Sequence, residues 1–114
     1  MAKPKKPPMS KYRVAVNGLN CQVDVNGHLL RMGFYTTRYV EAADAVEAAE
    51  RAVQMIREFD EFKVKIRNED RDPPVVVAEE IEEIETFDDV DPLEPGLAFY
   101  FEDAKPRKRW WKLW

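Results

Sequence analysis

The segment Cys21-Gln-Val-Asp-Val-Asn-Gly-His-Leu-Leu-Arg-Met32 alternates apolar and polar side chains on both sides of an Asn26-Gly27 pair. A period of two is typical of a β-strand with one buried face. Asn-Gly is the pair best suited to the positive φ angles of a type I′ turn, which joins two antiparallel strands. The segment therefore predicts a β-hairpin. Its two-residue turn places six side chains on one face in three pairs, namely Val25 with His28, Val23 with Leu30, and Cys21 with Met32.

The same alternation continues outward from the hairpin in both directions. Tyr12–Asn17 alternates and predicts a strand, which the segment Gly18-Leu-Asn separates from the hairpin. On the other side, the returning strand runs on to Val40. Within it, Gly33 predicts a bulge or a bend that lets so long a strand curl.

A helix is expected after the hairpin, from about Asp44 to Phe59. Asp44 precedes Glu47 by three residues, a spacing similar to that of a capping box. Apolar residues then recur with the spacing of one helix face. This predicted stripe consists of Val46, Ala49, Val53 and Ile56, with Ala45, Ala52 and Phe59 beside it.

Three shorter segments complete the expected secondary structure. Phe62–Ile66 alternates and predicts a short edge strand, although it also fits a frayed continuation of the helix. Val75–Phe87 fits either a bulged strand or a helix, and we favour a strand because three consecutive valines open it and no cap intervenes. Leu97–Phe101 is an aromatic final strand.

The resulting order, β-β-β-α-(β)-β-β, predicts an α+β fold. In it, a mostly antiparallel sheet packs one main helix on one face. We expect residues 1–10 to be a disordered basic and proline-rich arm, residues 11–103 to form a single α+β domain, and residues 104–114 to be a basic, tryptophan-rich tail.

Charge is segregated along the chain. The 22 acidic residues all lie between Asp24 and Asp103, and the segment Val14–Asp103 has only eight basic residues, so that its net charge is −14. The segments before and after it each contain five basic residues. An acidic body repels nucleic acids and anionic lipids, whereas the basic ends attract them.

The tail contains the residues most indicative of function. All three tryptophans of the chain lie in its last five residues, interleaved with basic side chains. Tryptophan stabilises by removing a large apolar area from water, and clustered Trp and Arg are typical of binding hot spots. The tail is too short to form a stable helix alone, so we expect it to order, if at all, on a surface, either of its own domain or of a partner. The predicted partner-binding residues are Arg107, Arg109, Trp110, Trp111 and Trp114.

We therefore expect a non-enzymatic protein-interaction module that uses the tail as its anchor. One alternative is binding of nucleic acid or of an anionic membrane surface through both basic arms together. A second alternative is a small carboxylate-based enzyme, which would need a pocket that gathers Glu79–Glu85 with Arg31 or Arg38. Exposed edge strands could also pair two copies into a homo-oligomer.

The remaining residues favour no established kind of catalytic or metal site. His28 and Cys21 should lie roughly 13 Å apart along the hairpin, and Ser10, the only serine, falls in the expected arm. One cysteine and one histidine cannot complete a zinc site, so we predict no metal and no cofactor. With Cys21 as the only cysteine, no apolar run after the basic N-terminus and no apolar segment of membrane-spanning length, we expect a cytoplasmic protein without a signal peptide.

Overall fold

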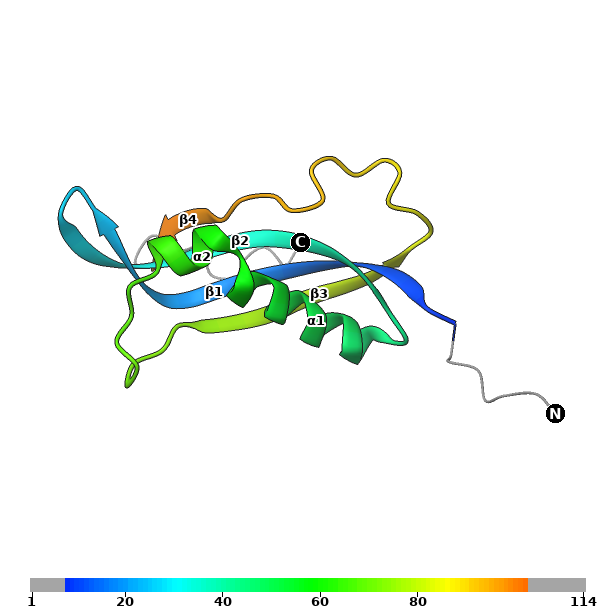
Figure 1. Cartoon of the computed structure of the whole chain (residues 1–114), viewed down its shortest axis with the longest axis horizontal. Coiled ribbons are helices and arrows are strands. Elements are labelled where there is room, and N and C mark those ends of the chain that lie inside the picture. The colour runs from blue at the N-terminus through cyan, green and yellow to red at the C-terminus, as the bar shows by residue number, and fades with distance from the viewer. Residues whose placement is uncertain (1–7, 103–114) are drawn as a thin grey trace, which may run out of the picture.

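A computed structural model describes residues 8–102, which form one antiparallel sheet and two helices. The strands are β1 (Ser10–Val25), β2 (His28–Ala42), β3 (Val75–Ile84) and β4 (Ala98–Phe101), and the helices are α1 (Ala45–Glu58) and α2 (Asp60–Lys65). The strand order across the sheet is β3-β1-β2-β4, and both helices lie against the same face of it (Figure 1). The predicted α+β class, a mostly antiparallel sheet with one main helix on one face, is confirmed.

The central hairpin has the predicted turn and register. Val25 pairs with His28, Val23 with Leu30, and Cys21 with Met32. Asn26 and Gly27 have φ angles of 53° and 87°, as a type I′ turn requires. Asp24 supports the turn, because its Oδ1 accepts a hydrogen bond of 2.8 Å from the Gly27 N–H.

The two strands predicted before the turn are one strand with a bulge. Gly18 pairs with Phe34 and Cys21 with Met32, so that Leu19 and Asn20 of β1 lie opposite Gly33 alone. The extra residue is therefore in β1 and not at Gly33, where the sequence predicted it. Asn20 accommodates the bulge with a φ of 58°, a left-handed conformation that asparagine tolerates better than most residues.

Two glycines let aromatic rings lie across neighbouring strands. A Cβ atom at Gly18 would fall 1.9 Å from the ring of Phe34, which occupies that space on the helix-covered face. A Cβ atom at Gly33 would fall 2.4 Å from the ring of Tyr100 on the other face. On each face of the sheet, an aromatic side chain from an adjacent strand thus covers a glycine.

Helix α1 begins where the sequence predicted, but its buried face is displaced. Asp44 is the N-cap and accepts a hydrogen bond from the Glu47 N–H. The fully buried residues are Ala48, Ala52 and Ile56, spaced four apart, so the small alanines let the helix approach the sheet closely. Val46, which the predicted stripe included, is 68% exposed.

Of the two interpretations of Phe62–Ile66, the edge strand is wrong and the helical one agrees with the structure. Residues Asp60–Lys65 form α2, and only Ile66 makes a single bridge, to Val23. Phe62 and Ile66 are four residues apart and share one helix face, which packs on the core, whereas Val64 points away and is 65% exposed. Phe62 contacts the ring of Phe34 edge-on, with a centroid separation of 6.2 Å.

Strand β3 confirms the interpretation of residues 75–87 as a bulged strand, although it ends at Ile84. Its register against β1 shifts between Ala15 and Val16, which pair with Glu80 and Ala78 respectively. Glu79 is therefore the extra residue of this bulge. Strand β3 and the short β4 are the two edges of the sheet.

The core between sheet and helices contains one fully buried arginine. Arg38 has no exposed surface, and its guanidinium lies 4.5 Å from the ring centroid of Phe59. Its Nη1 donates to Thr36 Oγ1, to the Thr37 carbonyl and to the Pro95 carbonyl. Burial lowers the pKa of Arg38, an effect that the carboxylates of Glu94 and Glu61 partly oppose. Arg38 thereby ties the connection between β3 and β4 to the centre of the sheet.

Candidate interaction face

Within residues 8–102, the helices leave one face of the sheet uncovered, and we call it the open face (Figure 1). The strand registers determine which side chains point to it. These are Arg13, Ala15, Asn17 and Leu19 of β1; Arg31, Gly33, Tyr35, Thr37 and Tyr39 of β2; Val75, Val77, Glu79, Glu80 and Glu82 of β3; and Ala98 and Tyr100 of β4.

A polar network stands at the centre of the open face and joins three strands. The Tyr100 hydroxyl donates to Asn17 Oδ1 over 2.9 Å, and Asn17 Nδ2 donates to Glu79 Oε1 over 2.6 Å. The ring of Tyr35 stacks on that of Tyr100, with their centroids 4.9 Å apart. Burial, together with the neighbouring Tyr35, raises the pKa of Tyr100 well above its ordinary value, so this hydroxyl remains protonated and available as a donor.

A shallow groove of about 380 Å³ lies beside this network. The small side chains of Ala15, Thr37 and Ala98 line it, together with the ring of Tyr35 and the backbone near Pro95. Small and aromatic side chains thus border an open groove, and Glu79 is among its lining residues.

At its β3 edge, the open face has both exposed apolar side chains and acidic side chains. Val75 and Val77 of β3 are 47% and 40% exposed. The same strand contains four glutamates and no basic residue. Arg13 balances only Glu82, whose Oε1 lies 3.1 Å from the Arg13 Nε. The edge at β3 therefore attracts basic ligands and repels polyanions.

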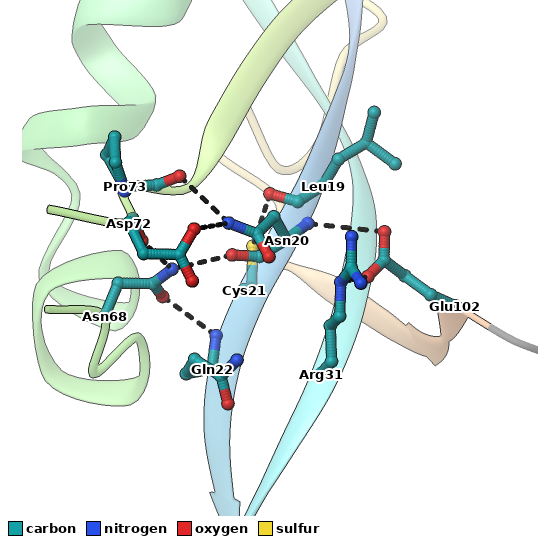
Figure 2. Close-up of polar contacts among 9 residues, drawn as sticks. All are labelled: Leu19, Asn20, Cys21, Gln22, Arg31, Asn68, Asp72, Pro73 and Glu102. Carbon is teal, nitrogen blue, oxygen red and sulfur yellow. Dashed lines mark hydrogen bonds and ion pairs between the residues drawn. The ribbon is translucent and has the colours of Figure 1, made fainter.

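Asn20 joins the bulge of β1 to the loop before β3 (Figure 2). Its Nδ2 donates to Asp72 Oδ1 over 2.8 Å and to the Pro73 carbonyl over 3.2 Å. Asn68, from the same loop, donates to the Asn20 carbonyl over 2.7 Å and accepts from the Gln22 N–H over 2.8 Å. These bonds fix the loop, and hence the start of β3, against the bulge.

The last described residue is held at the same place. Glu102 accepts a hydrogen bond of 3.4 Å from the Asn20 N–H, and its other carboxylate oxygen lies 2.6 Å from the Arg31 Nε (Figure 2). Arg31 belongs to the open face. The chain therefore enters its C-terminal segment beside that face, close to Leu19 and Val75.

The partner-binding residues that the sequence predicted are Arg107, Arg109, Trp110, Trp111 and Trp114, and they lie outside the described residues. Two of the five N-terminal basic residues lie in the part of the chain that the structure describes. Lys11 and Arg13 belong to β1, where they approach Glu41 and Glu82, so these two side chains are not part of a free arm. Ser10, expected in the arm, begins β1 and pairs with Ala42.

The groups needed for a carboxylate-based site are not brought together in the described part of the chain. Arg38 is buried on the helix-covered face and Arg31 pairs with Glu102, whereas among the glutamates of β3 Glu82 pairs with Arg13 and Glu79 accepts from Asn17. Cys21 is a buried thiol, and burial raises its pKa to about 12. Across residues 8–102, no cluster of three or more metal-ligating side chains is found, and neither helix is long and apolar enough to cross a membrane.

Comparison of the chain with protein families, with curated proteins and with solved structures found no match. Sequence reasoning missed the network of Asn17, Tyr35 and Tyr100. Asn17 shares its strand face with Arg13, so the alternation placed it on the polar side and gave no signal that its amide is buried.

Proposed function

We propose that this chain is a non-enzymatic, cytoplasmic protein-interaction module whose C-terminal segment anchors a protein partner. The observation that carries the proposal is that all three tryptophans lie in residues 110–114, whereas the core of the described residues is assembled from side chains between Tyr12 and Leu97. A core that is filled without tryptophan leaves the terminal indoles free to bury their surface elsewhere.

Charge favours a protein partner over a polyanion. The segment Val14–Asp103 has a net charge of −14, and the exposed β3 adds its glutamates to the open face. A nucleic acid or anionic lipid surface that approached the tail would meet this body, whose repulsion extends about 8 Å at physiological ionic strength. Lys11 and Arg13, which the polyanion alternative requires, are engaged with glutamates in the sheet.

The test is affinity capture with the full chain as bait. The variant Trp110→Ser, Trp111→Ser, Trp114→Ser should lose a protein that the unaltered chain captures at physiological salt. The matched control, Lys105→Ser, Lys108→Ser, Lys112→Ser, removes charge but keeps the indoles and both arginines, and it should retain the protein. Far-UV circular dichroism checks that both variants are folded.

Two results would contradict the proposal. One is a captured protein that the tryptophan variant retains. The other is capture by the unaltered chain that disappears after nuclease treatment or at moderate salt, which would favour a nucleic acid partner instead.

A further inference from the structure

The open face has apolar and aromatic side chains around its central polar network, and no described element covers them. Val75 and Val77, at the β3 edge, expose 47% and 40% of their surface, and a groove lined by Ala15, Tyr35, Thr37, Glu79 and Ala98 lies on the same face. An antiparallel sheet can face water on one side, but that side is then normally polar. Exposed apolar side chains next to a groove mark a surface on which another segment packs.

The C-terminal segment has the composition that such a surface requires. Residues 104–114 contain three tryptophans, one leucine and five basic residues, without any acidic residue. The indoles match the groove and the exposed valines, and the basic side chains match the glutamates of β3. Opposite charges that line up across a contact fix its register and speed its formation.

The segment begins where it can reach this surface. Arg31 and the Asn20 N–H hold Glu102 beside the open face, and Ala98 in the groove lies only four residues earlier, about 13 Å back along β4. Residues 103–110 can span at most about 27 Å when extended. The chain is therefore long enough to turn back and place Trp110 over the groove.

We propose that residues 104–114 fold back onto the open face of their own chain and seat their tryptophans over the groove lined by Ala15, Tyr35, Thr37 and Ala98. This inference rests on the proposed function, because the segment that docks is the anchor that a partner must engage. A protein partner that binds this anchor must therefore compete with the groove for the indoles.

The chain's own segment is favoured over that of a second copy by its attachment. A segment joined to the surface through a few residues has an effective concentration in the millimolar range. A second copy at micromolar concentration competes poorly against this. Docking of the segment within one chain also avoids the repulsion that would arise if the acidic β3 strands of two copies came close together.

Tryptophan fluorescence of the full chain tests the docking directly. Residues 8–102 contain no tryptophan, so the emission reports on the C-terminal segment alone. We expect a blue emission maximum and weak quenching by acrylamide. Ala98→Arg fills the groove and adds a positive charge, and it should shift the emission to the red and increase the quenching.

Matched variants on the helical side of the molecule serve as controls. Val64→Arg introduces the same charge at an exposed valine of α2 and should leave the emission unchanged. If Ala98→Arg does not fold, Glu80→Lys on the open face replaces it, with Glu50→Lys in α1 as its control. Glu80→Lys should redden the emission and Glu50→Lys should not.

Three outcomes overturn the inference. The first is a red, freely quenched emission of the unaltered chain, and the second is an equal shift in the open-face variant and its control. The third is a blue emission that is lost on dilution together with a dimer measured by light scattering, which would place the segment on a second copy. A red emission with capture still dependent on the tryptophans refutes the docking alone. A blue emission with capture independent of them supports the docking and refutes the proposed function.

Discussion

At position 18, even a methyl group would overlap the ring of Phe34. The ring lies flat over Gly18 on the helix-covered face, with a carbon atom 1.9 Å from where a Cβ would be. Phe34 is fully buried and contacts Phe62 and Phe99, so that it cannot move without disturbing both. The smallest residue is thus needed at position 18 to place the Phe34 ring in the core.

We predict that Gly18→Ala lowers the free energy of unfolding by about 1–3 kcal/mol, because the added methyl overpacks the core. Urea unfolding measures the loss. Gly96→Ala is the control, since the nearest atom there is a carboxylate oxygen of Glu61 at 3.0 Å, which can move. Phe34→Leu should cost less in the Gly18→Ala background than alone, and strictly additive losses would refute the explanation.

The buried thiol of Cys21 predicts how stability changes with pH. Burial, and to a lesser degree the charge of Glu102, raises its pKa from 9.0 to about 12. Between these values the folded protein retains a proton that the unfolded chain has lost. The free energy of unfolding should therefore fall as the pH rises above 9, by up to about 1.4 kcal/mol per pH unit.

Urea unfolding at pH 8, 9 and 10 checks this dependence. Cys21→Ala should remove most of the decrease between pH 9 and 10. Tyr100, whose pKa is also raised, contributes in the same direction above its ordinary pKa of 10.0, and Tyr100→Phe isolates that part. An unchanged slope in Cys21→Ala would contradict the assignment.

The elements with local signals were the ones that the sequence predicted well. Asn26-Gly27 fixed the hairpin and its register because a type I′ turn depends on two adjacent residues. Asp44 and Glu47 marked the start of α1 for the same reason. The sequence left residues 62–66 open between a strand and a helix, because Phe62, Val64 and Ile66 alternate as a strand does, while the contact that stabilises the helix is with Phe34, far away in the sequence.

The edge strand β3 is protected by its glutamates. Its ten residues form one border of the sheet, and pairing with β3 of a second copy would bring like charges together. We predict that Glu80→Gln, Glu82→Gln, Glu83→Gln allows self-association, measured as a rising mass with concentration in light scattering.

The control for this prediction neutralises three exposed carboxylates of the helices, with Glu50→Gln, Glu58→Gln and Asp60→Asn. This variant should remain at the mass of the unaltered chain. Equal association in both variants would show that net charge, and not the edge of the sheet, governs self-association.

At the scale of the whole molecule, Asn20 connects segments that are distant in sequence. It joins the bulge of β1 to the loop at Asp72 and Pro73 and to Glu102 (Figure 2). None of these contacts could be predicted, because they depend on a bulge placed by pairing with β2 and on the path of the loop. The open face was equally hidden, since Asn17, Tyr35 and Tyr100 meet only after three strands have aligned.

We predict that Asn20→Gly lowers the free energy of unfolding by about 1–3 kcal/mol, because it removes two side-chain hydrogen bonds while keeping a residue that tolerates a positive φ. In this variant, the rate of hydrogen exchange should increase more in residues 68–76 than in α1. Gly27 also has a positive φ but no side-chain contacts, so Gly27→Asn serves as the comparison. This variant should change hydrogen exchange in residues 68–76 only slightly. Uniformly faster exchange throughout Asn20→Gly would contradict a local role.

The position of Glu102 has a consequence for anything fused to this domain. The described chain starts at one end of β1 and finishes beside Asn20, ten residues further along that strand, which is on the order of 30 Å away. A rigid, hydrogen-bonded sheet separates the two exits. A pulling force applied through segments fused at the two ends would therefore reach the domain at residues 8 and 102 and be transmitted along the strands of the sheet.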